Sequence, residues 1–505
     1  MTKKIILIFL LTNPFFYSFS QKINTKIIDK EVSARFPLII ENFFNYLSLP
    51  NVTKNKEGLE KNKKFLEYFF YKINIPTLII NHQNTPYFYA NWDVGASNTI
   101  LFYLQLDGQP VDSDKWNQES PFKPVFKKKS NNIFSIVDKI NFEESLGDKY
   151  IFARSASDSK GPAFSFLSAL KIMKENKLTP DFNIKIIGDF EEENGSPSME
   201  SFVTNNINLL SADRILVMDG TRHVSNKPTI TYGARGIAYF SLKVYGANKN
   251  LHSGQYGNVI QNPVFVLSKL IGSMKNDDGI VLIQGFYDGI SFTKEEETYF
   301  ESLNDRIETL TSVVETINFS KVAETIQKAL HYPTLNIRGL KSGWTGEQIR
   351  TIIPNEALAE FDVRLSPETD GYEHLEKIKL HIEKQGFYVI DRPPSKEERI
   401  KYRKIIEMNS SVGKKPYRTS LDDPLGDWVE KGMVKALGHN DILKQSTTGG
   451  SQPVASFINL LNIPAVSIRI PNPDNYIHGP NENINVQNFI EGVKISLGIL
   501  TEPYE

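Results

Sequence analysis

The chain has 505 residues, of which 40% are hydrophobic and 23% are charged, and its formal net charge is −1 at pH 7. A chain of this length exceeds what one hydrophobic core supports, so we expect at least two domains, while the near-zero net charge argues against a nucleic-acid-binding protein. The absence of cysteine excludes disulfides, thiol nucleophiles and cysteine-ligated zinc, so any metal site must be built from histidine, aspartate and glutamate.

The first twenty residues are typical of a secretory signal peptide. Two lysines precede a short apolar run over residues 5–11, and Ser18 and Ser20 place small side chains at the expected offsets before a cleavage site. An uncleaved membrane anchor is the alternative, but Pro14 and the shortness of the run disfavour a spanning helix. Because no later segment approaches about eighteen uninterrupted apolar residues, we expect an exported protein, periplasmic or secreted, whose mature chain has no stable membrane span.

Short apolar runs alternate with amphipathic segments along the next part of the chain. Residues 161–175 carry apolar side chains at helical spacing. Strands buried on both faces are predicted for the apolar runs bounded by turn residues, at 98–106, 182–188, 214–218 and 463–470. This alternation favours an α/β sheet covered by helices.

The pattern changes near residue 233, where apolar and polar side chains begin to alternate. Strands are predicted over 237–245, 357–365 and 386–390, and helices over 262–275 and 372–384. This order suggests a small α+β module inserted into the larger sheet. Residues 391–395 (Asp-Arg-Pro-Pro-Ser) are typical of a return linker. The polar tracts 276–335 and 396–445 are expected to be helical or loop insertions.

Acidic and imidazole side chains follow the predicted strands, including a short strand over residues 150–153. In chain order they are Asp107, Asp158, Glu192, Glu193, Asp219 and His478. Ligands bind outside the carboxyl ends of strands in open α/β sheets, so we expect these side chains to converge on one crevice. Carboxylates that meet in one place repel one another unless cations neutralise them. Oxygen and imidazole ligands without sulfur suit zinc, manganese or cobalt.

Each of these side chains also has a simpler explanation. A lone aspartate after a strand is usually a turn or helix-capping residue. An acidic run such as residues 191–193 most often lies in a solvated loop, and a lone histidine such as His478 more often makes hydrogen bonds than binds a metal. Only their joint occurrence at successive strand ends favours a metal centre.

Several motifs, taken in order, resemble those of the di-metal peptidases that include carnosinase-type dipeptidases, carboxypeptidase G and aminoacylase, with the dipeptidase branch the most similar. They are residues 155–162 (SASDSKGP), 192–196 (EENGS), 230–236 (ITYGARG), 251–254 (LHSG), 449–451 (GGS) and 478–482 (HGPNE). The resemblance implies a phosphorylase/hydrolase-like zinc-peptidase catalytic domain with an inserted ferredoxin-like α+β lid or dimerisation domain. The expected boundaries are a signal peptide at 1–20, the catalytic domain at 21–233 and 392–505, and the lid at 234–391.

The resemblance also implies the metal ligands. Asp158 would bridge two divalent metal ions, with Glu193 and His478 completing one site and Asp219 completing the other. Zinc is the expected metal, with manganese or cobalt as alternatives. The first strand departs from the family pattern, because Gln105 stands where the family has a metal-binding histidine.

Gln105 leaves three alternatives open. Its amide oxygen could coordinate a metal ion, but a neutral amide suits harder ions than zinc. The chain could therefore have a weakened first metal site, bind a single ion, or have lost its activity. Thr447 stands where the family has an arginine ahead of the GGS motif, which leaves the substrate preference open as well.

The resemblance further implies catalytic residues and substrate contacts. Glu192 would be the general base that moves a proton from the metal-bound water to the leaving amine. His252 in the lid would stabilise the oxyanion across a dimer interface. Asp107 is the third residue expected to be catalytic. Arg364 would grip a substrate carboxylate, because a guanidinium group binds a carboxylate through two parallel hydrogen bonds, and Ser451 would also contact the substrate.

The sequence is compatible with two functions from different classes. The leading hypothesis is a metal-dependent peptidase or amidohydrolase, dipeptidase or carboxypeptidase-like, that acts on small peptides or N-acyl amino acids and forms a homodimer through the lid. The retained pair of Glu192 and Glu193 supports it. The alternative is a catalytically impaired family member that acts as a secreted binding protein, and Gln105 is its main support.

Overall fold

The computed structural model describes residues 23–504, with the side chains of residues 312 and 313 left out. The predicted signal peptide lies outside the described residues and stays a prediction. None of the helices within residues 23–504 combines the length and the apolar character that a membrane crossing requires.

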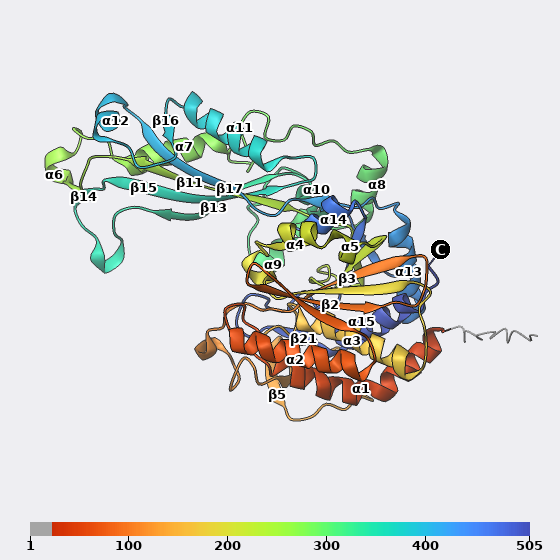
Figure 1. The fold of residues 1–505 in the computed structure, drawn as a ribbon. Coiled ribbons are helices and arrows are strands. Elements are labelled where there is room, and N and C mark those ends of the chain that lie inside the picture. Colours follow the sequence, from red (N-terminus) through yellow and green to blue (C-terminus); the bar gives the residue numbers. More distant parts are fainter. Residues whose placement is uncertain (1–22, 505) are drawn as a thin grey trace, which may run out of the picture.

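The larger domain is built on an eight-stranded mixed sheet (Figure 1). Its strands are, in spatial order, β1 (Thr77–His82), β2 (Thr85–Trp92), β7 (Asn183–Asp189), β3 (Thr99–Gln105), β8 (Arg214–Val217), β20 (Ala465–Arg469), β9 (Thr229–Thr231) and β19 (Leu443–Gln445). The four central strands β7, β3, β8 and β20 are parallel, so their carboxyl ends meet at one edge. These are the four strands that the apolar runs predict.

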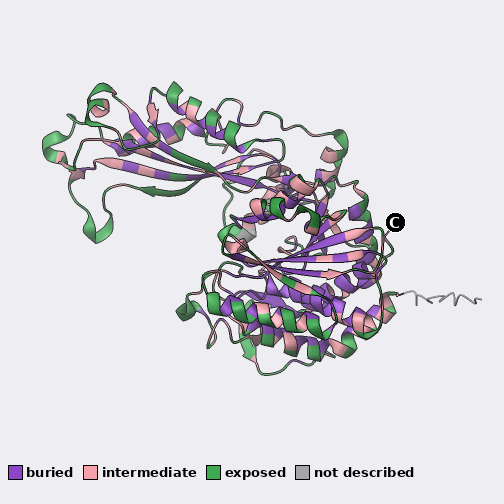
Figure 2. Ribbon diagram, in the orientation of Figure 1, coloured by how far each residue is buried: buried purple, intermediate pink, exposed green. Residues whose placement is uncertain are grey.

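Helices cover both faces of this sheet, which explains why its central strands are apolar on both sides. One face carries α1 (Thr25–Leu47), α2 (Lys56–Lys72), α3 (Lys160–Glu175), α13 (Pro424–Leu437) and α15 (Val486–Leu500), and the other carries α4 (Met199–Asn205), α5 (Ile207–Leu210) and α14 (Ala455–Leu461). Figure 2 shows the sheet buried between these two layers. In the larger core the ring of Phe43 stacks on Phe164 and Phe489, with centroids 5.6 and 4.4 Å apart. The predicted α/β catalytic domain is confirmed.

A separate four-stranded sheet packs against helices α1 and α15. Its strands are β21 (Asn483–Asn485), β6 (Lys149–Phe152), β4 (Val125–Ser130) and β5 (Ile133–Val137). The short strand predicted at residues 150–153 is therefore β6 of this sheet and not a strand of the central one. Its partners are distant in sequence, since β6 pairs with β21 and β4, and four residues carry too little pattern to predict such pairing.

The inserted module is a five-stranded sheet with helices on one face, and it projects from the catalytic domain (Figure 1). Its strands are β13 (Thr334–Lys341), β15 (Glu356–Leu365), β11 (Gly236–Tyr245), β17 (Ile405–Val412) and β16 (Tyr388–Ile390), and its helices are α7 (Pro263–Met274) and α11 (Gly371–Lys384). Stacked rings of Phe240 and Phe361, 4.4 Å apart, lie in its own core. The predicted α+β lid is confirmed.

The chain leaves the lid later than the sequence suggests. Residues 391–395 do not form the return linker, because β17 follows them and pairs with β11 inside the lid sheet. Their two prolines precede helix α12 (Lys396–Lys401), which is capped by the Ser395 hydroxyl. A proline-rich turn is a local signal, whereas the pairing of β17 is set by residues more than a hundred positions away. The crossing back to the catalytic domain begins at Gly413.

Short elements fill the remaining connections. They are η1 (Ser113–Lys115), η2 (Glu192–Asn194), β10 (Gly233–Ala234), β12 (Leu251–His252), α6 (Ser253–Tyr256), α8 (Lys294–Ser302), η3 (Ile307–Leu310), α9 (Thr311–Val314), α10 (Ile326–Leu330), η4 (Gly346–Gln348), β14 (Ile352–Ile353) and β18 (Tyr417–Arg418). The tract 276–335 thus contains short helices, as expected. The tract 396–445 holds α12, β17, β18, α13 and β19, so strands that the sequence did not predict lie within it.

Candidate active site

A cavity of about 1050 Å³ opens at the carboxyl ends of the central strands, where the lid joins the catalytic domain. Its walls come from the loops after β3, β7, β8 and β20, from the lid strands β11 and β15, and from the crossing after β17. A cavity of this size is sufficient for a small peptide. Of the residues implied by the resemblance, most line this cavity: Gln105, Asp158, Glu192, Glu193, Asp219, Arg364, Ser451 and His478.

Three of these side chains form a group that fits a divalent metal ion. Ligand atoms of Asp158, Glu193 and His478 all lie within 4.8 Å of one another. His478 Nε2 is 3.0 Å from Asp158 Oδ2 and 3.5 Å from Glu193 Oε2. The other oxygen, Glu193 Oε1, is buried and has no hydrogen-bond partner among the described residues. Buried polar atoms normally have a partner. A cation bound by Glu193, Asp158 and His478 would provide one for this oxygen.

The protonation equilibria of this group also favour a cation. Burial and the nearby charge of Asp158 raise the pKa of Glu193 to about 10. The hydrogen bond to Asp158 raises the pKa of His478. Protons and a divalent ion would therefore compete for the same ligand atoms.

The loop that carries Asp158 is held by a buried carboxylate, Glu482. Its oxygens accept hydrogen bonds from the backbone N–H groups of Ser155, Ser157 and Asp158, at 2.9, 2.9 and 2.8 Å. The guanidinium of Arg154 donates to the same carboxylate at 2.7 Å, and both side chains are almost completely buried. Glu482 ends the sequence motif at 478–482, but its function as the anchor of this loop could not be predicted from the motif.

We expect the substitution Glu482→Gln to lower the free energy of unfolding by about 3 kcal/mol or more, because it leaves the buried charge of Arg154 without its partner. Chemical denaturation at neutral pH measures this change. Asp441→Asn is the matched control, since it breaks an exposed ion pair with Lys227 and should leave stability unchanged. Equal stability of the Glu482→Gln variant and the control would contradict the anchoring function.

Asp107 lies behind the cavity and not in it. It is completely buried, and its carboxylate accepts hydrogen bonds from the backbone N–H groups of Glu192 and Glu193, at 3.0 and 3.1 Å, and from the Thr53 hydroxyl at 2.7 Å. These contacts fix the turn that carries both glutamates. Asp107 is therefore a positioning residue, and its assignment as a catalytic residue is corrected because its carboxylate does not reach the cavity.

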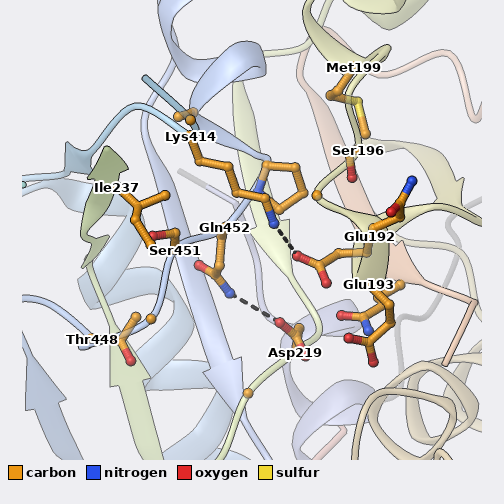
Figure 3. Close-up of a pocket in the computed structure, with 18 of the residues that line it drawn as sticks. Glu192, Glu193, Ser196, Met199, Asp219, Ile237, Lys414, Thr448, Ser451 and Gln452 are labelled. Atoms are coloured by element: carbon orange, nitrogen blue, oxygen red, sulfur yellow. Dashed lines mark hydrogen bonds and ion pairs between the residues drawn. The ribbon is translucent and has the colours of Figure 1, made fainter. Parts of the chain in front are cut away.

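Glu192 projects into the cavity and is paired with a lysine that the sequence did not indicate. Lys414 Nζ donates to Glu192 Oε1 at 2.6 Å, from the crossing that follows β17 (Figure 3). Burial raises the pKa of Glu192 to about 7, although the positive charge of Lys414 opposes this shift. A carboxylate with a pKa near neutrality suits proton transfer. Lys414 lies in the polar tract 396–445, where no motif marks it.

Asp219 and Gln105 lie where the resemblance implies the second metal ion. Their contacts differ from those of Asp158, Glu193 and His478. The Asp219 carboxylate accepts hydrogen bonds from the Ser159 hydroxyl and from Gln452 Nε2, the latter at 3.2 Å (Figure 3). Arg469 Nη1 donates to the backbone carbonyl of Asp219 at 3.0 Å. Gln105 is buried, and its Nε2 has no hydrogen-bond partner within the described part of the chain. Gln452, directly after the GGS motif, was not predicted.

The two residues expected to contact substrate lie together, whereas the expected oxyanion-stabilising histidine lies elsewhere. Arg364 Nη1, on lid strand β15, donates to the Ser451 hydroxyl of the catalytic domain at 2.9 Å. His252 precedes α6 at the end of the lid that is remote from the central sheet (Figure 1). Its ring accepts a hydrogen bond from the Gly254 backbone at 3.1 Å and does not line the cavity. Within one chain, His252 is therefore not part of this site.

The fold and the site together are those of a metallopeptidase with an inserted lid. The chain belongs to peptidase family M20/M25/M40, whose sequence pattern matches residues 101–502. This confirms the family resemblance and identifies the protein as a hydrolase of peptide bonds.

Named relatives agree with this assignment. Beta-Ala-His dipeptidase of Homo sapiens is 26% identical over 415 residues, which cover 81% of this chain and 75% of the relative. Cys-Gly metallodipeptidase dug1 of Schizosaccharomyces pombe is 26% identical over 410 residues, which cover 79% of each chain. The crystal structure of the M20 family metallo-carboxypeptidase Sso-CP2 from Sulfolobus solfataricus matches with a TM-score of 0.76 and 27% identity, covering 92% of this chain and 98% of that one.

Proposed function

We propose that this protein is a metal-dependent dipeptidase that hydrolyses short peptides with a free carboxyl-terminal carboxylate. The observation that carries the proposal is the placement of two groups in one cavity. Asp158, Glu193 and His478 form the candidate ligand set beside Glu192, and Arg364 with Ser451 presents donors for a carboxylate. The relatives that are named dipeptidases support this substrate class.

The chain's own residues account for the proton transfers that hydrolysis needs. A divalent ion held by Asp158, Glu193 and His478 would polarise the scissile carbonyl and make water a better nucleophile. Glu192 accepts a proton from the attacking water and delivers it to the leaving nitrogen, so that one water is consumed and an amine and an acid are released. Lys414 keeps the carboxylate of Glu192 oriented through Oε1 and leaves Oε2 free for this transfer.

A substrate panel tests the proposal. Protein loaded with zinc, manganese or cobalt should hydrolyse unmodified dipeptides, and the same dipeptides with a carboxyl-terminal amide should react much more slowly. N-acyl amino acids are the third set, since they share the free carboxylate and lack the free amine. The dipeptidase proposal fails if no dipeptide is cleaved with any of the three metals.

We expect Arg364→Ala to raise KM for dipeptides roughly tenfold to a hundredfold with a smaller change in kcat, because a charged hydrogen bond to a carboxylate contributes about 1.5–3 kcal/mol. Steady-state kinetics measure both parameters. Arg392→Ala is the control, because Arg392 pairs with Glu398 on the lid surface. A KM that is unchanged in the Arg364 variant would mean that Arg364 does not bind the substrate carboxylate.

A peptide-binding protein without turnover is the competing function, and Gln105 is the observation that favours it. Its amide replaces an ionisable ligand next to Asp219, which weakens the case for a complete two-ion centre. Calorimetric titration with dipeptides separates the two functions. Tight binding of a dipeptide that stays intact for hours in the presence of metal would favour the binding protein.

Export and dimerisation are further parts of the proposal. Residues 1–20 support export, and fractionation of cells producing the full chain tests it. His252 supports a homodimer, because it pairs with Ile352 at the remote end of the lid, and exposed apolar residues such as Val259 and Ile349 lie a few positions from this pair in the chain. Sedimentation equilibrium tests the dimer, and a monomer that hydrolyses dipeptides at full rate would exclude a contribution of the partner's His252.

A further inference from the structure

We infer that the centre holds one divalent ion per chain, at Asp158, Glu193 and His478, and that Lys414 and Gln452 make the protein's own replacement for a second ion. The inference rests on the metal centre of the proposed function and concerns its composition. The family resemblance implies two ions. The residues of this chain fit one of the two positions and not the other.

The second position lacks a sufficient set of ionisable ligands. A zinc-type site normally uses at least three protein ligands. Beside Asp219, the chain offers the shared carboxylate of Asp158 and the neutral amide of Gln105. The buried Nε2 of that amide has no partner within residues 23–504, so no hydrogen bond at Nε2 fixes the orientation that coordination through its oxygen would need. The first position, in contrast, has two carboxylates and an imidazole.

Both carboxylate oxygens of Asp219 accept hydrogen bonds from the protein, whereas Glu193 accepts one from Gln109 at Oε2 and its Oε1 has no partner in the described chain. The Ser159 hydroxyl donates to Oδ1, and Gln452 Nε2 donates to Oδ2 at 3.2 Å. A cation in the second position would compete with both donors for the same oxygens. These two hydrogen bonds therefore stabilise a state of Asp219 that needs no metal ligand.

A positive side chain also lies on this side of the cavity. Lys414 donates to Glu192 Oε1 at 2.6 Å, and the Lys414 and Glu192 side chains are only 18% and 14% exposed. Glu192 lines the same cavity as Asp158 and Asp219. A divalent ion placed among these carboxylates would be repelled by the ammonium group, whose charge is weakly screened at this depth. The ammonium compensates the negative charge of Glu192, and the guanidinium of Arg469, which donates to the backbone carbonyl of Asp219 at 3.0 Å, adds a second positive charge at this position.

Metal stoichiometry tests the inference without relying on activity. The full chain is saturated with zinc, manganese or cobalt in turn, freed of unbound metal, and analysed for metal and protein content. We expect one ion per chain with each metal, and two ions per chain would overturn the inference. Asp219→Asn should keep the single ion, while His478→Ala should lose it. A lower metal content or a more than tenfold weaker affinity in folded Asp219→Asn would also overturn it.

A gain of the second ion gives the complementary test. In the double variant Gln105→His with Gln452→Leu, a third ionisable ligand appears and the amide donor on Asp219 is removed, so we expect two ions per chain. Circular dichroism and thermal unfolding confirm that each variant is folded before the metal is counted. A folded double variant that still holds one ion would show that these residues do not exclude the second ion, and would overturn the assignment.

The outcomes separate this inference from the proposed function. One ion per chain in a protein that cleaves no dipeptide removes the dipeptidase proposal and leaves the inference standing. Two ions per chain in a protein that cleaves dipeptides would remove the inference and support the dipeptidase proposal. No bound ion under any condition would remove the metal centre on which both depend.

Discussion

Glu192→Gln is expected to lower kcat for dipeptide hydrolysis by roughly 10²–10⁴-fold while the metal content stays unchanged. Glutamine has nearly the same shape as glutamate but cannot accept the proton of the attacking water. The ligand set of Asp158, Glu193 and His478 is left intact, so metal binding should survive. Steady-state kinetics together with metal analysis of the same sample measure both quantities.

Glu191→Gln is the matched control for this experiment. Glu191 is the preceding acidic residue, but its carboxylate accepts a hydrogen bond from Thr85 at 2.5 Å and does not line the cavity. The kcat of this variant should stay within about twofold of that of the parent enzyme, since the Glu191 carboxylate does not line the cavity. If Glu192→Gln loses the metal and Glu193→Gln keeps it, the functions of the two glutamates are exchanged.

Asp158→Asn is expected to remove the metal ion and reduce activity to the level of chelator-treated protein. Asp158 contributes the carboxylate that lies 3.0 Å from His478 Nε2, and an asparagine there gives the site a neutral oxygen in place of a charged one. The loss should equal that caused by a strong chelator on the parent protein, because both leave the same residues without an ion.

Two comparisons make this result decisive. Asp441→Asn, on an exposed surface pair, should keep both metal and activity. Excess metal should restore the chelator-treated parent but not the Asp158 variant at the same concentration. Retention of a full metal content by Asp158→Asn would mean that Asp158 is not a ligand, and the centre would have to be placed elsewhere in the cavity.

The central strands of the catalytic sheet could be predicted because each is encoded by one continuous apolar run of the sequence. The runs that became β3, β7, β8 and β20 are apolar along their whole length, as strands covered on both faces must be. Their shared direction then placed Glu193 and Asp219 at one edge. Asp158 and His478 were identified from the order of the motifs. The strand before Asp158, β6, belongs to another sheet, and the loop held by Glu482 brings Asp158 to the cavity.

The residues that the sequence did not reveal are those whose partners are distant in the chain. Lys414 is 222 residues from Glu192, and Gln452 is 233 residues from Asp219. Neither has a neighbouring pattern that predicts a buried contact, since lysine and glutamine are usually exposed. The lid boundary was misplaced for the same reason, because only the pairing of β17 with β11 shows that the strand belongs to the lid.

The position of Lys414 just after the last strand of the lid has a mechanical consequence. The segments by which the chain enters and leaves the lid are hydrogen-bonded to each other, with Ile237 N donating to Lys414 O at 2.9 Å and Gly413 N donating to Ile237 O at 2.8 Å. The ammonium that holds Glu192 is therefore carried by the segment through which the chain leaves the lid. We expect any change in the angle between the lid and the catalytic domain to alter the contact between Lys414 and Glu192, because the lysine belongs to the connection and the glutamate to the catalytic domain.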